Sequence, residues 1–217
     1  MLRILLADDH AVVRHGIKQI ISETHPQATF GEACSLHELH ELVSKGEWDV
    51  VILDLAFPDG NGLEILKQIK KDYPNLPVLI LSMYPEDQYA IRTIRAGASG
   101  YLSKESASEE LVTALQKILT GGQYISPSVA DELVLYARHD DDQPAHKSLS
   151  DREYQVLCLI ASGKELREIS QELALSSKTV STYRSRLLTK MNMKTNAELT
   201  YYAIQNGLVM KDVKQSN

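Results

Sequence analysis

The feature that most constrains this chain of 217 residues is a short apolar run that ends on a carboxylate. Val50–Leu53 is apolar and largely β-branched, and Asp54 follows it directly. Such a run, without alternation, is typical of a parallel strand buried on both faces. Pro58, Gly60 and Gly62 then predict a loop before an amphipathic helix. We therefore expect Asp54 at the carboxyl end of a central strand, where ligand sites form in open α/β sheets.

A second strand-like run brings two more carboxylates to the same edge, because Leu2–Ala7 is followed by Asp8 and Asp9. Alone, Asp54 is equally consistent with a solvated or capping acid. Three carboxylates at neighbouring strand ends, however, repel one another and lose hydration. A divalent cation relieves this repulsion, and Mg²⁺ combines one or two carboxylates with water and phosphate oxygens. The cluster therefore predicts an acidic pocket that holds Mg²⁺ for phosphoryl chemistry.

Two further strand ends supply a hydroxyl and an ammonium group. Val78–Leu81 is followed by Ser82, and the run that begins at Gly100 is followed by Lys104. Near a metal-bound carboxylate, these groups bind the oxygens of a phosphoryl group.

Strands and helices alternate through the first half of the chain, which predicts a doubly wound five-stranded parallel sheet with helices on both faces. The expected strands lie near residues 2–7, 28–32, 50–54, 77–82 and 99–102, and the expected helices near 11–23, 35–46, 62–72, 86–96 and 107–120.

The charge distribution divides the chain into two parts. Residues 1–146 contain 12 Lys and Arg against 22 Asp and Glu, whereas residues 147–217 contain 11 against 7. This asymmetry indicates that only the second part meets nucleic acid. Between the parts, we expect a short helix from Ser126 or Pro127 to about Arg138, followed by a solvated linker.

Bulk properties favour a cytoplasmic protein with no membrane partner. No apolar run reaches the length of a membrane span, and the N-terminus resembles a strand rather than a signal peptide. Cys34 and Cys158 stand far apart and alone, which fits reduced thiols better than a disulfide or a metal site.

The basic part contains a predicted helix-turn-helix. Ser150 and Glu153 form a capping-box pattern that opens one helix, and a second helix spans about 165–173. Ser176 opens a third helix that ends near residue 191, and a fourth runs to about 206. Together they predict a small all-α domain of four helices.

The third helix separates apolar from polar residues, because Val180, Tyr183, Leu187 and Met191 share one side. No acidic residue occurs between Glu172 and Glu198, as a groove lined by phosphates requires. The predicted DNA-binding residues are Lys178, Thr179, Ser181, Thr182, Tyr183, Ser185, Arg186 and Lys190.

The first half resembles the receiver domain of bacterial response regulators, which has a flavodoxin-like fold. The matching residues are Asp8, Asp9, Asp54, Pro58, Gly62, Ser82, Tyr101 and Lys104. The resemblance implies that Asp54 is the phosphoacceptor and that Asp8, Asp9, Asp54 and the carbonyl of Ala56 bind Mg²⁺. It further implies that Ser82 is the switch hydroxyl, that Lys104 binds phosphate and that Tyr101 is an aromatic residue that rotates inward.

The second half resembles the tetrahelical helix-turn-helix domain of the LuxR type. The matching segments are Leu149–Glu153, Val156–Leu157, Gly163–Lys164, Glu168–Ile169, Leu173, Leu175–Ser176, Lys178–Val180 and Lys190–Met191. Together the halves resemble a response regulator of the NarL/FixJ family, and the segments Thr182–Arg186 and Glu198–Thr200 are similar to GacA/UvrY-like or BvgA-like members. The expected domains are a receiver at 1–121, a linker with a short helix at 122–147 and a DNA-binding domain at 148–217.

The family's base-facing positions fall on Ser181, Thr182 and Ser185. These short hydroxyl side chains discriminate bases less sharply than Arg or Asn, so Lys178, bridging water or DNA shape are further sources of specificity. Tyr183 replaces a histidine that is frequent in the family.

The expected function is transcription regulation, without enzymatic turnover. A sensor histidine kinase phosphorylates Asp54, which controls homodimerisation and binding to an inverted repeat in double-stranded promoter DNA. The fourth helix offers Leu199, Tyr202 and Ala203, either as a dimer surface or as core. Two alternatives remain: a phosphorylation-independent DNA-binding regulator with a vestigial pocket, and an Asp-dependent Mg²⁺ phosphohydrolase with Asp54 as its nucleophile.

Overall fold

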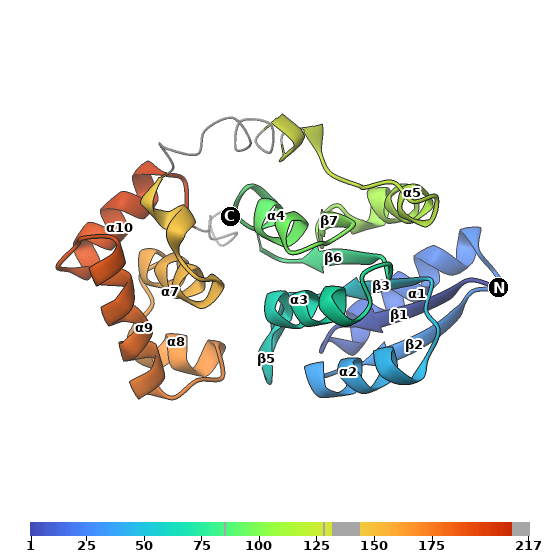
Figure 1. The fold of residues 1–217 in the computed structure, drawn as a ribbon, viewed down its shortest axis with the longest axis horizontal. Coiled ribbons are helices and arrows are strands. Elements are labelled where there is room, and N and C mark those ends of the chain that lie inside the picture. The colour runs from blue at the N-terminus through green and yellow to red at the C-terminus, as the bar shows by residue number, and fades with distance from the viewer. Residues whose placement is uncertain (85, 128, 132–143, 210–217) are drawn as a thin grey trace, which may run out of the picture. The chain divides into compact units, whose positions relative to one another are not determined.

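The computed structural model describes residues 1–217 apart from 85, 128, 132–143 and 210–217. The chain divides into two compact units, Met1–Leu135 and Tyr136–Asn217 (Figure 1). Across the described part of the chain, no helix combines the length and apolar character needed to cross a bilayer.

The first unit is built on a parallel sheet of five strands in the order β2-β1-β3-β6-β7. The apolar runs form central strands of this sheet, and every side chain of β3 and β6 is buried. This confirms the predicted doubly wound sheet. The strands are β1 (Arg3–Ala7), β2 (Thr29–Ala33), β3 (Val50–Leu53), β6 (Val78–Ser82) and β7 (Gly100–Ser103).

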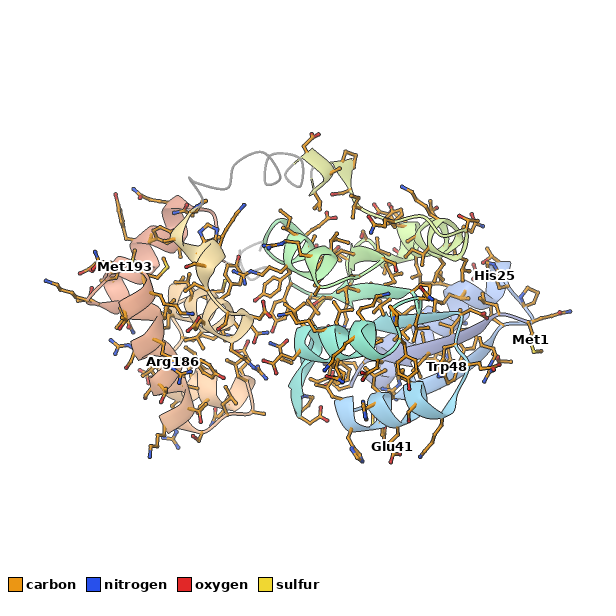
Figure 2. All side chains as sticks on the ribbon, viewed as in Figure 1. Met1, His25, Glu41, Trp48, Arg186 and Met193 are labelled. Carbon is orange, nitrogen blue, oxygen red and sulfur yellow. The ribbon has the colours of Figure 1, made fainter. Side chains whose placement is uncertain are left out.

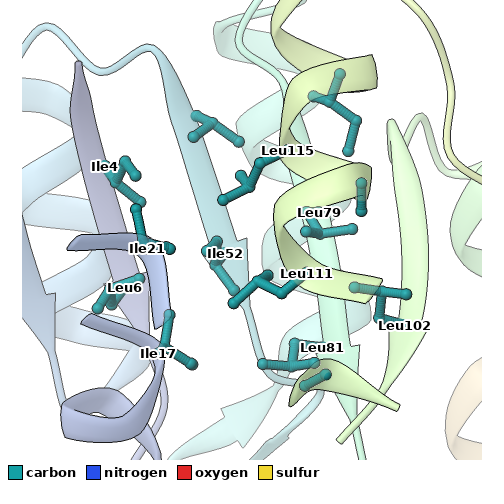
Figure 3. Close-up of a cluster of buried hydrophobic side chains, with 14 residues drawn as sticks. Ile4, Leu6, Ile17, Ile21, Ile52, Leu79, Leu81, Leu102, Leu111 and Leu115 are labelled. Atoms are coloured by element: carbon teal, nitrogen blue, oxygen red, sulfur yellow. The ribbon is translucent and has the colours of Figure 1, made fainter. Parts of the chain in front are cut away.

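Helices cover both faces of this sheet. Helices α1 and α5 pack on one face, where their apolar side chains meet those of the strands (Figure 3). Helices α2, α3 and α4 complete the other layer, with α2 against β2 and α3, and α4 against β7. The helices are α1 (Ala11–Thr24), α2 (Leu36–Lys45), α3 (Gly62–Asp72), α4 (Glu86–Arg95) and α5 (Ala107–Leu119).

Successive side chains of β1 point to opposite faces of the sheet and contribute to both layers of the core. Ile4 and Leu6 belong to the cluster under α1 and α5, whereas Leu5, between them, is equally buried but absent from that cluster. This period of two is expected for a strand enclosed on both faces.

The only tryptophan of the sequence, Trp48, is fixed beside β2. Its indole N–H donates a hydrogen bond to the Leu42 carbonyl at 2.8 Å, and the Arg3 guanidinium lies 5.4 Å from the ring centroid. A Cβ at Gly31 would lie only 2.3 Å from the ring, so the indole depends on a glycine in β2.

The second unit is helical. Helix α7 packs against α9 and α10, and α8 packs against α9. Ala174 adopts a positive φ of 50° in the tight turn between α8 and α9, the predicted helix-turn-helix connection. The elements are η1 (Ala145–Ser148, a 3₁₀ helix), α7 (Asp151–Ala161), α8 (Leu166–Glu172), α9 (Ser177–Lys190) and α10 (Asn196–Gln205).

The segment between the units is described only in part. Tyr124, placed in the expected linker, pairs with the edge of β7: its N–H donates to the Ser99 carbonyl at 2.9 Å. Pro127 and residues 129–131 are helical, and residues 132–138 of the expected short helix lie outside the described residues.

Candidate functional site

Lys104 lies between two carboxylates at the carboxyl ends of the central strands. Its Nζ atom is 2.6 Å from Oδ2 of Asp8 and 2.6 Å from Oδ2 of Asp54. The parallel register of β1 and β3 aligns Ala7 with Leu53, which brings the two following aspartates together. Both aspartates are only 3% exposed. The strand ends therefore meet as the apolar runs predicted.

The backbone beyond the strand holds the other oxygen of Asp54. Oδ1 accepts hydrogen bonds from the N–H groups of Leu55 at 2.6 Å and Ala56 at 3.2 Å. Both carboxylate oxygens are thus fixed by donors, which orients the side chain into the pocket.

Asp9 and His10 complete an acidic cluster that the sequence predicted only in part. Asp8, Asp9, His10 and Asp54 place potential ligand atoms within 4.8 Å of one another. His10 Nδ1 lies 2.8 Å from Asp9 Oδ1 and 3.2 Å from Asp8 Oδ1. His10 was not among the predicted ligands. The available signal was its position immediately after the aspartate pair.

The charge of the pocket favours a cation. Burial raises the pKa of the Asp54 carboxyl, and the Lys104 ammonium only partly offsets this effect. Burial works to lower the pKa of Lys104, but hydrogen bonds to Asp54 and Asp8 outweigh it and raise this pKa. The cluster thus contains three carboxylates, and the one ammonium pairs with two of them, Asp8 and Asp54.

The donor set fits a small hard cation. Asp9 Oδ1 is buried and accepts no well-aligned hydrogen bond from any described residue, although His10 Nδ1 lies 2.8 Å away. Carboxylate oxygens are among the ligands that Mg²⁺ prefers. The predicted ligands Asp8, Asp9 and Asp54 lie together, and Ala56 follows Asp54 closely enough for its N–H to reach the same carboxylate.

Ser82 and Tyr101 hold the same peptide segment. Ser82 ends β6, is fully buried, and its Oγ accepts a hydrogen bond from the Tyr84 N–H at 3.3 Å. The hydroxyl of Tyr101, also fully buried, donates to the Tyr84 carbonyl at 2.7 Å. Because the Lys104 N–H donates to the Ser82 carbonyl at 2.9 Å, the three predicted switch residues are linked to the segment that leads into α4.

The segment after Asp54 is more ordered than the predicted loop. Strands β4 (Ala56–Phe57) and β5 (Gly60–Asn61) form a small antiparallel hairpin. Strands of two residues are too short to show a periodicity, so no pattern in the sequence predicts them. The Asp59 carboxylate in this hairpin accepts a hydrogen bond from the Leu36 N–H at 2.9 Å, at the start of α2.

Gly62 permits a close approach of backbone segments. A Cβ at this position would lie 2.5 Å from the Asp54 carbonyl oxygen and 2.6 Å from the Leu55 Cα atom. Asn61 accepts the Leu63 N–H at 2.9 Å and thereby caps α3. Gly62 and Asn61 therefore allow α3 to begin close to the backbone of Asp54.

A second candidate site is the polar face of α9. Val180 and Leu187 are buried on one side, and Ser176 caps the helix by accepting the Thr179 N–H at 3.1 Å. The side chain of Arg186 extends from this helix (Figure 2). The exposed members of the predicted DNA-binding set are Lys178, Ser181, Thr182, Ser185, Arg186 and Lys190.

Lys190 and Arg184 have structural partners that the sequence did not reveal. Lys190 Nζ lies 2.7 Å from Oε2 of Glu153, whose side chain is buried. Arg184 donates to Asn196 Oδ1 at 2.6 Å, toward α10 and away from the predicted DNA face. Tyr183 and Thr179 are half-buried. Pairs between different helices leave no signature at helical spacing.

Of the three residues of α10 that fitted either the core or a dimer surface, two lie in the core. Leu199 and Ala203 are fully buried and belong to the core. Tyr202 lies 2.9 Å, from Oη to Nδ1, from His146 of η1. The exposed apolar residues are instead Tyr201 and Ile204, at 64% and 61% exposure.

Comparison with known proteins identifies a family for each half of the chain. Residues 4–116 match the response regulator receiver domain, and residues 147–203 match the luxR family of bacterial regulatory proteins. Response regulator UvrY of Escherichia coli strain K12 is 34% identical over 209 residues, covering 96% of both chains. The chain belongs to the NarL/FixJ family of response regulators. Its DNA-binding half is thus of the LuxR type.

Other relatives share the same arrangement. Response regulator GacA of Pseudomonas aeruginosa is 34% identical over 211 residues, covering 96% of this regulator and 98% of GacA. Oxygen regulatory protein NreC of Staphylococcus carnosus is 34% identical over 215 residues, covering 96% and 99%. UvrY and GacA support the predicted GacA/UvrY-like resemblance.

A solved structure is similar over nearly the whole regulator. RcsB from Salmonella enterica serovar Typhimurium, bound to promoter rprA in the presence of phosphomimetic BeF3-, has a TM-score of 0.63 at 25% identity. It covers 93% of this chain and 98% of that one.

Proposed function

We propose that this regulator accepts a phosphoryl group on Asp54 from a sensor histidine kinase and thereby controls its own dimerisation and DNA binding. The observation that carries this proposal is the pocket itself. A buried carboxylate, fixed by two backbone N–H groups, lies 2.6 Å from a buried ammonium. Such a carboxylate is placed for attack on phosphorus, and the ammonium for binding the transferred oxygens.

The transfer forms one bond and breaks one. A carboxylate oxygen of Asp54 attacks phosphorus, and the phosphorus–nitrogen bond of the kinase phosphohistidine breaks, so that the imidazole leaves with the electron pair. Lys104 and the Ser82 hydroxyl are the groups that bind the phosphoryl oxygens. Asp8, Asp9, Asp54 and the Ala56 carbonyl are the proposed Mg²⁺ ligands. When bound, Mg²⁺ supplies positive charge that offsets the phosphoryl and carboxylate charges.

The switch residues connect the pocket to α4 through Tyr84. Turning the Ser82 hydroxyl toward a phosphoryl group removes the acceptor that holds the Tyr84 N–H at 3.3 Å. Tyr101, already buried and bonded to the Tyr84 carbonyl, still holds this peptide after Ser82 has turned. A two-state change in this segment is the proposed signal to a dimer surface.

The output is sequence-specific binding to double-stranded promoter DNA. Two protomers place their α9 helices in successive major grooves of an inverted repeat. The proposed contacts are Lys178, Thr179, Ser181, Thr182, Tyr183, Ser185, Arg186 and Lys190. The RcsB complexes with promoter DNA and BeF3- support this assignment by similarity. We assign residues 1–121 to the receiver, 122–147 to the linker and 148–217 to the DNA-binding domain, and place the regulator in the cytoplasm, with its promoter DNA.

A salt-resolved binding titration tests the proposal. The full chain is titrated against a random pool of DNA duplexes, with and without beryllofluoride and Mg²⁺. We expect tighter binding and enrichment of an inverted repeat only with beryllofluoride. Asp54→Asn is expected to abolish this difference while keeping the basal affinity.

Two results distinguish the alternative functions. Equal enrichment in both states and in Asp54→Asn would favour a phosphorylation-independent regulator. Repeated turnover of a soluble phosphoester would favour a phosphohydrolase. Equal, weak binding that falls steeply with salt would leave only a non-specific basic surface.

A further inference from the structure

Three hydroxyl groups on the polar face of α9 donate their protons to the helix backbone. Thr182 Oγ1 donates to the Lys178 carbonyl at 3.0 Å. Ser185 Oγ donates to the Ser181 carbonyl, and Thr189 Oγ1 to the Ser185 carbonyl, each also at 3.0 Å. Each bond joins a residue to the carbonyl four positions earlier, as serine and threonine hydroxyls commonly do within helices.

These bonds determine what the side chains offer to a ligand. A hydroxyl has one proton to donate and two lone pairs that accept. Once the proton is directed at the helix, the lone pairs remain for the groove. Thr182, Ser185 and Thr189 are all exposed, so their oxygens are accessible as acceptors.

The major groove presents both classes of partner. The amino groups of adenine and cytosine donate, whereas N7 and O6 of guanine and O4 of thymine accept. The geometry points to a recognition helix that selects the exocyclic amino groups of adenine and cytosine through hydroxyl acceptors at Thr182 and Ser185. This inference rests on the proposed DNA-binding function and specifies the bases which that site prefers.

Lys178 and Ser181 lie on the same face but are not limited in this way. Lys178 is exposed and carries only donors, so it suits guanine or phosphate. The Ser181 hydroxyl has no hydrogen-bond partner among the described residues, so its proton is available. Thr182 and Ser185 therefore offer hydrogen-bond acceptors to a ligand, whereas Lys178 and Ser181 offer donors.

The experiment uses the full chain, beryllofluoride, Mg²⁺ and the duplex enriched from the random pool. Single bases in this duplex are replaced by analogues. 2-Aminopurine in place of adenine removes the major-groove amino group, and N4-methylcytosine blocks that of cytosine. 7-Deazaguanine removes the N7 acceptor of guanine. We expect an amino-group analogue to weaken binding about fivefold at one or more positions, the lower end for a specific base contact.

Variants assign that loss to individual hydroxyls. Thr182→Val keeps the side-chain shape without the acceptor, and Ser185→Ala removes the oxygen. Each variant is expected to bind the natural duplex more weakly and to lose sensitivity to the analogue at its own position. Ser162→Ala is the matched control, because Ser162, directly after α7, makes the same kind of bond, to the Cys158 carbonyl at 2.9 Å. This control should keep the full sensitivity.

Three outcomes would overturn the inference. In the first, 7-deazaguanine rather than the amino-group analogues weakens binding, and Thr182→Val or Ser185→Ala removes that effect; the hydroxyls would then donate. In the second, neither variant changes any analogue effect although a specific site is enriched; the proposed function would then stand without this inference. In the third, no site is enriched, and the two fail together.

Discussion

Lys104 joins two buried carboxylates, with Nζ 2.6 Å from Oδ2 of Asp8 and 2.6 Å from Oδ2 of Asp54. The ammonium therefore connects the ends of β1 and β3 to the segment that follows β7. Only 9% of the lysine side chain is exposed, so water does little to screen these contacts.

Replacing this lysine should destabilise the first unit and increase its response to divalent cations. Lys104→Met leaves two buried carboxylates without a cation, which costs about 3–5 kcal/mol when a buried pair loses one partner. We expect saturating Mg²⁺ to recover more of the free energy of unfolding in the variant than in the native chain. Chemical denaturation with and without Mg²⁺ measures both quantities.

Lys45→Met is the control for Lys104→Met, because Lys45 forms only an exposed pair with Glu41 at 3.3 Å. Its effect should stay within about 0.5 kcal/mol. An equal gain from Mg²⁺ in the native chain and in Lys104→Met would contradict the prediction.

The hydroxyl of Tyr101 should matter more for the switch than for phosphorylation. Tyr101→Phe keeps the buried ring but removes the bond to the Tyr84 carbonyl, at a cost of about 1 kcal/mol in stability. We expect Asp54 to be phosphorylated at an unchanged rate, while the increase in DNA affinity on phosphorylation becomes smaller. Radiolabel transfer and DNA titration measure the two effects, and an unchanged affinity increase would exclude the proposed coupling.

Two glycine-to-alanine substitutions should have opposite effects. Gly62→Ala places a methyl group 2.5 Å from the Asp54 carbonyl oxygen, so backbone must move; we expect a loss of about 2 kcal/mol or more. Gly16→Ala, inside α1, meets no atom within 4 Å and should stabilise the chain by up to about 1 kcal/mol. Thermal unfolding of both variants measures the two changes in stability. An unchanged stability of Gly62→Ala would contradict the prediction.

Glu153 should make the stability of the second unit depend on pH. Burial works to raise the pKa of this carboxyl, but hydrogen bonds to Lys190 and Ser150 outweigh it and hold the pKa below the ordinary value of 4.5. A lowered pKa stabilises the folded state above the unfolded value, and this contribution disappears as pH falls through the folded pKa.

Glu153→Gln is therefore expected to cost about 1–3 kcal/mol at neutral pH. The difference from the native chain should shrink below about pH 4.5. Denaturation followed by far-ultraviolet circular dichroism, repeated across this range, measures it. Glu172→Gln, which changes an exposed pair with Lys164, should show little effect. A loss that does not vary with pH would mean that the charge of Glu153 is irrelevant.

The sequence predicted the receiver half well because its signals are local. Apolar runs such as Val50–Leu53 cannot remain exposed, and strand ends in a parallel sheet share one edge. Asp8, Asp54 and Lys104 therefore converge once these strands pair in parallel. The hairpin of β4 and β5 escaped prediction because its strands are too short to show a period.

The missed contacts depend on tertiary packing. Lys190 and Glu153 are 37 positions apart and lie on different helices. The sequence pattern of neither helix specifies that they pair. Leu199 and Ala203 fit a buried or a dimer face equally well in one dimension; only the packing of α7 against α10 decides for the core. His10 was accessible to sequence reasoning, as the residue next to two predicted ligands.

The position of Trp48 gives the molecule a built-in optical reporter. As the sequence contains no other tryptophan, indole emission excited selectively at long wavelength arises from the first unit alone. Loss of its contact with Gly31 in β2 exposes the indole to water and should shift that emission to the red. Unfolding of the first unit can therefore be followed by fluorescence while circular dichroism records both units, without attaching a dye to either.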